Sequence, residues 1–211
     1  MTSALPVLPP LLDVAGTAVF ALTGALLAAR LRQSFVTVAF FALVTGVGGG
    51  SVRDVLIGVP AFWLTSPWVA PVVFTAAMLA WFMPVRIWPA LLLEWADAAG
   101  LAAFSALGAA KALALGVAPL PAIVLGVVTG CVGGIIRDVL AGVPSILMRP
   151  ELYVTAAALS ATLCAGALIA GLPQSAALGM AAIAGFALRG AAIWWKIELP
   201  AYSRFDATDK H

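Results

Sequence analysis

The chain has 211 residues, of which 64% are hydrophobic and only 9% are charged, and its mean hydropathy is +1.11. A soluble domain carries about a quarter of its residues as charged side chains, so this composition excludes a soluble globular protein and predicts one that lies in lipid. The net charge of +2 is too small to indicate a nucleic-acid partner, and we expect none.

Apolar runs of about 18 to 21 residues recur along the chain, which is the length that crosses about 30 Å of hydrocarbon. We predict an all-α membrane protein with seven transmembrane helices in a single domain and no cleaved signal peptide. The predicted spans are roughly 11–29, 35–52, 67–84, 90–109, 119–136, 152–171 and 175–194.

One motif occurs twice, as TGVGGGSVRDVLIGVP from Thr45 and as TGCVGGIIRDVLAGVP from Thr129, 84 residues apart. The same offset aligns residues 11–64 with 95–148 without a gap, and 21 of these 54 positions are identical. The identities include Asp, Arg, Gly, Thr and Pro, which chance similarity between two apolar helices would not produce. We therefore infer a duplication.

Each duplicated unit contains three predicted spans. Because three is odd, the second unit enters the membrane from the opposite side, which predicts an inverted repeat related by an axis in the membrane plane. We divide the chain into repeat 1 (11–93), repeat 2 (94–172), a seventh helix (173–195) and a polar cytoplasmic tail (196–211).

Basic residues gather on one side of this topology and predict its orientation. They follow spans one, three, five and seven: Arg30, Arg32, Arg86, Arg149, Arg189, Lys196, Arg204 and Lys210. Cytoplasmic loops of membrane proteins carry an excess of Lys and Arg. We therefore expect the N-terminus outside and the C-terminus in the cytoplasm.

Spans two and five each contain a glycine run followed by Arg-Asp. Glycines remove side-chain cover from a helix, so we expect the helix to kink or unwind there. Irregular backbone at membrane depth survives only where protein buries it or water reaches it. We therefore predict two broken helices that meet around a central cavity. Their glycines are Gly48, Gly49, Gly50, Gly133 and Gly134.

The Arg-Asp pairs that follow the glycines fall inside the membrane, where a lone charge costs about 2.5–3.5 kcal/mol on insertion scales. Neighbouring residues on a helix point about 100° apart, so an adjacent Arg and Asp do not face each other. We expect each arginine to pair with a carboxylate of the other repeat: Arg53 with Asp138 or Asp97, and Arg137 with Asp54 or Asp13.

One further residue breaks the symmetry of the repeat, and two further features have more than one interpretation. Lys111, near the outer end of span four, corresponds to Leu27 in the first repeat and so breaks the symmetry. Asp13 and Asp97 begin their spans, where each serves either as a helix cap or as a pore residue. The glycine runs also form small-x-x-x-small patterns, which fit a purely structural role in close helix packing.

Motifs for soluble chemistry are missing. GVGGGS lacks the third glycine of G-x-G-x-x-G. The single histidine is the terminal His211, and Cys131 and Cys164 have no metal-ligand spacing. We expect no enzymatic activity, no metal site and no cofactor.

GGGSVRD at residues 48–54 and VGGIIRD at residues 132–138, within three plus three plus one spans, resemble the bacterial relatives of the trimeric intracellular cation (TRIC) channels. The resemblance covers residues 11–195, and the same family includes bacterial proteins described as glycine transporters. The animal members carry Lys-Glu-Val in the first motif and bind inositol lipids, whereas this chain has Ser51-Val52-Arg53.

The resemblance implies a homotrimer in the bacterial plasma membrane, in contact with lipids, with one hourglass pore in each subunit. The leading hypothesis is a passive monovalent-cation channel permeable to K⁺ and constricted at kinked helices two and five. The alternatives are a carrier of a small zwitterion such as glycine, and a structural membrane protein. The expected pore and gating residues are Gly48, Gly49, Gly50, Ser51, Arg53, Asp54, Gly133, Gly134, Arg137, Asp138, Lys111, Asp13 and Asp97.

Overall fold

The computed structural model describes residues 10–148 and 151–200, and this part of the chain is helical. Five helices are long and apolar enough to cross a membrane: α1 (Pro10–Arg30), α2 (Phe35–Ile57), α5 (Ala90–Ala114), α6 (Pro119–Ala141) and α8 (Gln174–Trp195). The prediction of an all-helical membrane protein is confirmed.

Two shorter apolar helices, α4 (Val69–Phe82) and α7 (Val154–Ile169), occupy the third and sixth predicted spans. With 14 and 16 residues they fall short of the usual length for crossing a bilayer, so the count of seven spans stays a prediction. Three short elements were not predicted: α3 (Phe62–Thr65), η1 (Val85–Ile87) and η2 (Ile146–Met148).

Helices α2 and α6 extend beyond the predicted ends of spans two and five, because the Arg-Asp pairs are themselves helical. Each helix ends at a glycine in the left-handed region, Gly58 with φ 81° and Gly142 with φ 66°. Glycine adopts this conformation without a steric penalty, which makes it the usual residue just past a helix end. The two glycines are 84 residues apart.

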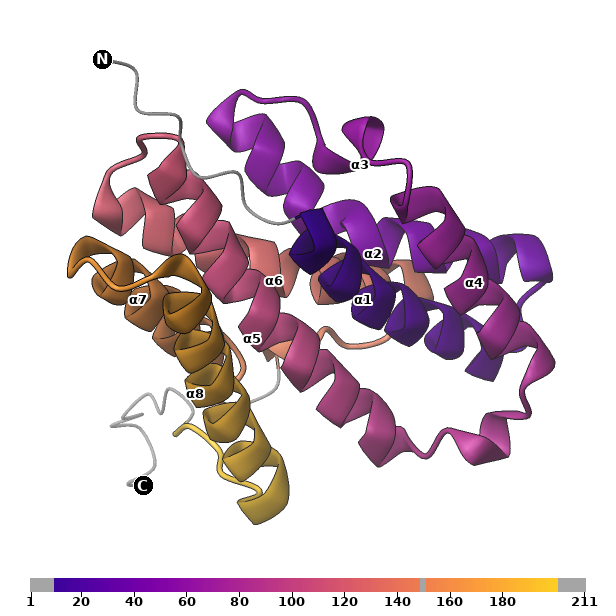
Figure 1. The fold of residues 1–211 in the computed structure, drawn as a ribbon. Helices are drawn as coiled ribbons and strands as arrows, with labels where there is room; N and C mark the ends of the chain where they lie inside the picture. Colours follow the sequence, from indigo (N-terminus) through magenta and orange to yellow (C-terminus); the bar gives the residue numbers. More distant parts are fainter. Residues whose placement is uncertain (1–9, 149–150, 201–211) are drawn as a thin grey trace, which may run out of the picture.

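Helix α5 lies inside the bundle, between α1 on one side and α7 and α8 on the other (Figure 1). It also packs along α6, which in turn packs against α2. The arrangement brings the two glycine-bearing helices, α2 and α6, into direct contact.

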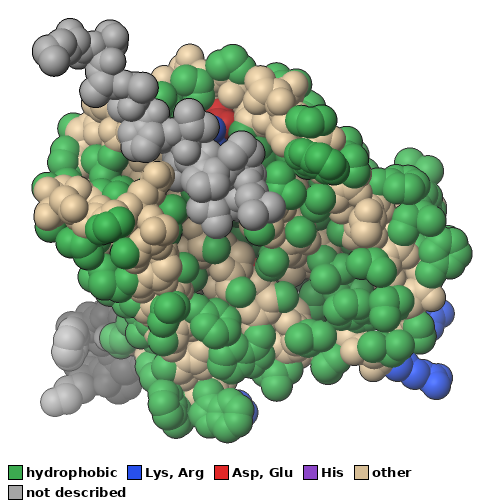
Figure 2. All heavy atoms as spheres, in the orientation of Figure 1, with side chains coloured by type: hydrophobic (Ala, Val, Ile, Leu, Met, Phe, Trp, Pro, Cys, Tyr) green, Lys and Arg blue, Asp and Glu red, His purple; other side chains and the backbone are tan. Residues whose placement is uncertain are grey.

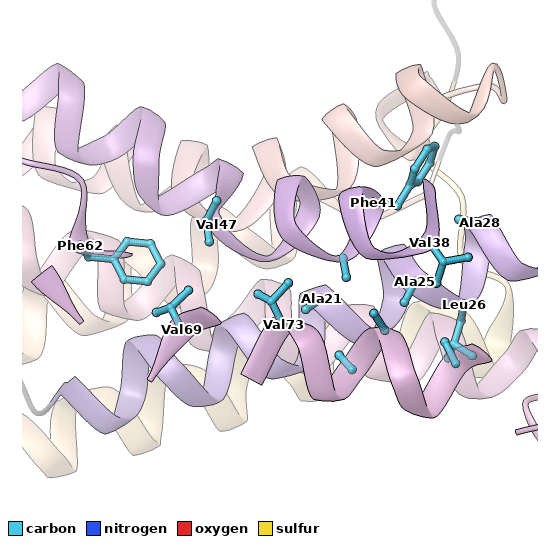
Figure 3. Packing of buried hydrophobic residues seen from close by; sticks show 14 residues of the cluster. Ala21, Ala25, Leu26, Ala28, Val38, Phe41, Val47, Phe62, Val69 and Val73 are labelled. Atoms are coloured by element: carbon cyan, nitrogen blue, oxygen red, sulfur yellow. The ribbon is translucent and has the colours of Figure 1, made fainter. Parts of the chain in front are cut away.

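Small side chains fill the core between α1, α2 and α4. Figure 3 shows the alanines of α1 facing Val38 and Phe41 of α2 and Val69 and Val73 of α4, with Phe62 closing one end. Because Ala offers little bulk, the helices can approach closely and gain dispersion contacts, which drive helix association in lipid.

The outer surface is largely hydrophobic, as Figure 2 shows for one face, with blue basic side chains near its edge. Large apolar side chains that point outward include Leu56, Leu120, Ile183, Trp194 and Trp195. A surface of this kind is stable only against hydrocarbon, which is what the composition predicts.

Candidate functional site

The glycine runs lie where α2 and α6 cross, and both helices are continuous through them. The prediction of helices broken at these glycines was wrong. A Cβ on Gly133 would lie 2.7 Å from the carbonyl oxygen of Thr45, and a Cβ on Gly49 would overlap the carbonyl oxygen of Thr129. Because these glycines have no side chain, the backbone of the partner helix can approach them closely, while the helix that contains each glycine stays regular.

The same two threonines each face a second glycine. The side chain of Thr45 lies against Gly24 of α1, and that of Thr129 lies against Gly108 of α5. Every partner in one contact is 84 residues from its counterpart in the other. The duplicated sequence thus produces duplicated contacts at the crossing.

The remaining glycines of the two runs leave room for side chains of neighbouring elements to pack against the helix. A Cβ on Gly48 would lie 3.0 Å from Ile136, and one on Gly50 would meet the ring of Phe62 at 2.5 Å. A Cβ on Gly134 would lie 2.9 Å from the hydroxyl of Tyr153. Next to the first run, Ser51 donates to the carbonyl of Val47 at 2.7 Å and accepts from the indole of Trp63 at 2.9 Å.

A group of four charged side chains, the Arg53 cluster, forms at the end of α2, with Arg53 and Asp54 fully buried and Asp13 and Lys111 partly buried. Arg53 Nε donates to Asp54 Oδ1 at 2.8 Å, and Lys111 Nζ donates to the same oxygen at 2.8 Å. Asp13 Oδ1 lies 3.6 Å from Arg53 Nη1. Arg53 is fully buried, and its guanidinium lies 5.9 Å from the centre of the Phe62 ring.

A corresponding group, the Arg137 cluster, forms at the end of α6 from Arg137, Asp138 and Asp97. Arg137 Nε donates to Asp138 Oδ1 at 2.9 Å, and Arg137 Nη1 donates to Asp97 Oδ1 at 2.7 Å. Thr23 of α1 accepts a further hydrogen bond from Nη1 at 3.2 Å, which links the cluster to the first repeat.

The arginines therefore pair within their own repeat, and the prediction that they pair across repeats was wrong. Each arginine reaches an aspartate on the first helix of its own unit, because α1 packs along α2 and α5 packs along α6. The guanidinium stem is also long enough for Nε to turn back to the next residue in sequence. Among the acid–base contacts of the two clusters, the Lys111–Asp54 pair is the one that joins the two repeats.

Asp54 and Asp138 also hold the chain that follows their helices. Asp54 Oδ2 accepts from the backbone N–H of Phe62 at 2.8 Å, and Asp138 Oδ2 accepts from that of Ile146 at 2.9 Å. These residues begin α3 and η2, so each aspartate binds the N-terminus of a short helical turn. Asp97 is buried well inside α5, which excludes the cap role considered for it.

A cavity of about 260 Å³ adjoins the Arg137 cluster. Its polar lining comes from Arg137, Asp138 and Asp97 of the cluster, together with Thr23, Arg30 and Glu94. Leu27, the counterpart of Lys111, also lines it. Within residues 10–148 and 151–200, no group of three or more His, Cys, Asp or Glu side chains could hold a metal ion.

The ion pair of one buried arginine was missed from the sequence. Arg189 of α8 is 1% exposed, lies 2.5 Å from Glu151 and has its guanidinium 5.5 Å from the centre of the Tyr153 ring. Its interpretation as a loop charge was therefore wrong. Three other residues used for the predicted orientation, Arg149, Arg204 and Lys210, lie outside the described part of the chain.

A family model described as "Glycine transporter" matches the chain twice, over residues 10–84 and 94–168. The chain belongs to this family. The two matches to the glycine transporter family start 84 residues apart, at the offset that relates the two clusters.

Bacterial membrane proteins are similar to this chain over most of their length. A UPF0126 membrane protein of Vibrio cholerae is 40% identical over 92% of this chain and 82% of its own length. The UPF0126 inner membrane protein YadS of Escherichia coli strain K12 is 39% identical over 91% of this chain and 95% of its own length.

Solved structures of TRIC channels share the fold. The TRIC orthologue from Rhodobacter sphaeroides is 37% identical, with a TM-score of 0.81 over 89% of this chain and 97% of that one. A second TRIC cation channel structure is 27% identical, with a TM-score of 0.82 over 93% and 98%. The resemblance to the bacterial TRIC relatives, inferred from the doubled motif, is confirmed.

Proposed function

We propose that the protein is a monovalent-cation channel, permeable to K⁺, with one permeation path in each subunit. The observation that carries the proposal is the pair of buried charged clusters on either side of the α2–α6 crossing. Intramembrane charges are costly and usually mark an ion or substrate pathway. The likeness to TRIC cation channels, which extends over most of the chain, supports the same function.

Internal pairing answers the main objection to a cation path, which is the presence of two arginines. Arg53 lies against Asp13 and Asp54, and Arg137 lies against Asp97 and Asp138, so neither presents a bare positive charge. A cation passing these clusters meets neutralised basic groups and carboxylate oxygens. Carboxylate groups are the charged side chains that line cation-selective pores.

In this proposal the narrowest point is the α2–α6 crossing, where Gly49 and Gly133 admit the partner backbone. A small separation of the two helices would open the path, and a bend at the glycines would produce such a separation. The glycines thus serve both close packing in the closed state and the hinge function expected from the sequence.

We further propose that three copies assemble, as in the structures described as trimeric TRIC channels. A groove of about 590 Å³ between α1, α5 and α8 offers a face for this assembly. Its exposed floor includes the small residues Ala15, Ala99 and Ala103, which permit close helix approach.

The proposed topology has seven spans in two inverted repeats plus α8, with the N-terminus outside and the C-terminus in the cytoplasm of the bacterial inner membrane. The basic residues Arg30, Arg32 and Arg86 lie on the proposed cytoplasmic side. The description of YadS as an inner membrane protein agrees with this location. The domain division at residues 93/94 and 172/173 remains part of this proposal.

A second candidate function is a carrier of a small zwitterion such as glycine. The cavity beside the Arg137 cluster favours it, because Arg30 and Arg137 could bind a carboxylate while Glu94 and Asp97 could bind an ammonium group. Single-channel recording from reconstituted protein separates the two functions. Stepwise K⁺ currents would support the proposal of a channel. Slow, saturable glycine uptake without such currents would overturn that proposal and favour a carrier.

A further inference from the structure

The Arg53 cluster and the Arg137 cluster differ by one charge. Lys111 belongs to the first, and Leu27 takes its place in the second. The Arg53 cluster therefore holds two basic and two acidic side chains, whereas the Arg137 cluster holds one basic and two acidic side chains. Among the residues that the structure describes, the Arg137 cluster therefore carries one more acidic than basic side chain, and an excess charge is unfavourable inside a membrane.

Lys111 shows where the compensating charge sits in the first cluster. Its Nζ lies 2.8 Å from Asp54 Oδ1, the oxygen that also accepts from Arg53 Nε. The corresponding oxygen in the second cluster, Asp138 Oδ1, accepts within the described residues only from Arg137 Nε, at 2.9 Å. A carboxylate oxygen can accept more than one partner, so this oxygen has capacity for a cation.

A second carboxylate oxygen is available at the same place. Asp97 Oδ2 is buried and makes no hydrogen bond of normal geometry in the part of the chain that the structure describes, while the Tyr153 hydroxyl is the polar group that interacts with this carboxylate. The side chain of Asp97 is 4% exposed and, like Asp138 and Leu27, lines the 260 Å³ cavity. The other two charged residues of the lining, Arg30 and Glu94, have opposite signs and leave the deficit unchanged.

We infer that the cavity binds one monovalent cation between Asp97 and Asp138, in the position that corresponds to the Lys111 ammonium group. The ligand is a compact single positive charge, either an alkali-metal ion or the ammonium group of a small amine. The inference deepens the proposed channel and rests on it, since the permeation path is what brings cations to the cavity.

Thallium(I), a heavy substitute for K⁺, provides a direct test in crystals of the full-length protein. Anomalous scattering from soaked wild-type crystals should give one peak per subunit, beside Asp97 and Asp138. The Leu27→Lys variant supplies the ammonium group from the chain itself and should lose the peak. Leu27→Met, which preserves apolar bulk, is the matched control and should keep it. Lys111→Leu should gain a second peak beside Asp54.

Absence of a wild-type peak, or an undiminished peak in Leu27→Lys, would overturn the inference. If Leu27→Lys does not fold, Lys111→Leu still decides: no second peak there contradicts the equivalence of the two positions. A soak that adds excess glycine separates the two ligand sources, since loss of the peak assigns the site to an amine and persistence assigns it to a metal ion.

The site and the channel can fail separately. K⁺ currents from liposomes without a thallium peak would remove the site and leave the channel. A thallium peak in protein that carries no current would leave the binding site and remove the channel. If the cation site and the channel are both right, Leu27→Lys should lower K⁺ flux at least tenfold, because its ammonium group would occupy the site in the permeation path.

Discussion

Gly49 of α2 is in contact with the backbone of Thr129 of α6, at a distance that leaves no room for a methyl group on Gly49. Gly133 and Thr45 make the corresponding contact from the other side of the crossing. Two contacts of this kind fix the separation of the helices from both directions. Any side chain at either glycine must push α2 and α6 apart, because backbone atoms cannot rotate away.

The first prediction concerns this crossing. In Gly49→Ala or Gly133→Ala, overpacking of a close contact should cost about 1–3 kcal/mol. Ala brings a gain of about 1 kcal/mol in helix propensity over Gly, so the folded protein should be destabilised by up to about 2 kcal/mol. Thermal unfolding in detergent measures the effect, with K⁺ flux per folded oligomer recorded in parallel.

Gly166 of α7 provides the matched control, because a Cβ there would meet nothing within 4 Å. Gly166→Ala should be neutral or slightly stabilising. If Gly49→Ala unfolds at the wild-type temperature, the helices separate without cost and the crossing is not a tight contact. If its flux per folded protein is also normal, the proposed hinge is wrong.

The sequence identified the helices and the duplicated motif because hydropathy and identity at a fixed offset are local signals. It did not identify the partners of Arg53, because pairing depends on which helix lies alongside α2. Helix periodicity places Arg53 and Asp54 on different faces, yet a flexible four-bond stem lets Arg53 Nε reach Asp54 at 2.8 Å. The direction of the Cα–Cβ bond alone does not predict which partner a side chain as long as arginine reaches.

The roles of Asp54 and Asp138 beyond the helices were also hidden. Each binds a backbone N–H eight residues further along the chain, Phe62 and Ile146 respectively, after a turn whose path no periodic pattern encodes. The available signal was the identity VPxx that follows both motifs at the same offset, in residues 59–62 and 143–146. The turn and the aspartate recur together in both repeats, which indicates that the aspartate holds the turn.

The second prediction compares the two arginines. Arg137→Ala leaves Asp97 and Asp138 without any basic partner in the cluster, whereas Arg53→Ala leaves Lys111 on Asp54. Breaking a buried ion pair by removing one partner costs about 3–5 kcal/mol. We expect Arg137→Ala to approach that cost and Arg53→Ala to fall below it.

The yield and melting temperature of the detergent-purified oligomer give this comparison. Adding Asp97→Asn to Arg137→Ala removes one of the stranded charges and should restore part of the lost stability. A larger loss in Arg53→Ala than in Arg137→Ala would contradict the compensating role assigned to Lys111.

The third prediction concerns Arg189, which anchors α8 to the start of α7 through Glu151 and the ring of Tyr153. Arg189→Ala should lower the free energy of unfolding by about 1.5–3 kcal/mol, since it removes a charge-assisted hydrogen bond between a buried guanidinium and a partly exposed carboxylate. Lys196→Ala, at the exposed end of the same helix, should have little effect. Equal melting temperatures for the two variants would show that the Arg189 pair adds no stability.

The fourth prediction concerns topology. Gln33 lies in the exposed turn between α1 and α2, and Pro173 lies in the exposed turn before α8. In the proposed inverted repeat these turns face opposite sides of the membrane, because α2, α4, α5, α6 and α7 lie between them.

A cysteine at Pro173 should react with an impermeant thiol reagent added to intact cells, and one at Gln33 should react only after the cells are opened. Both native cysteines are buried, and replacing Cys131 and Cys164 by Ala removes any background. Labelling of both positions from the outside would require an even number of crossings between them and would remove the inverted repeat, whereas the opposite pattern would reverse its orientation.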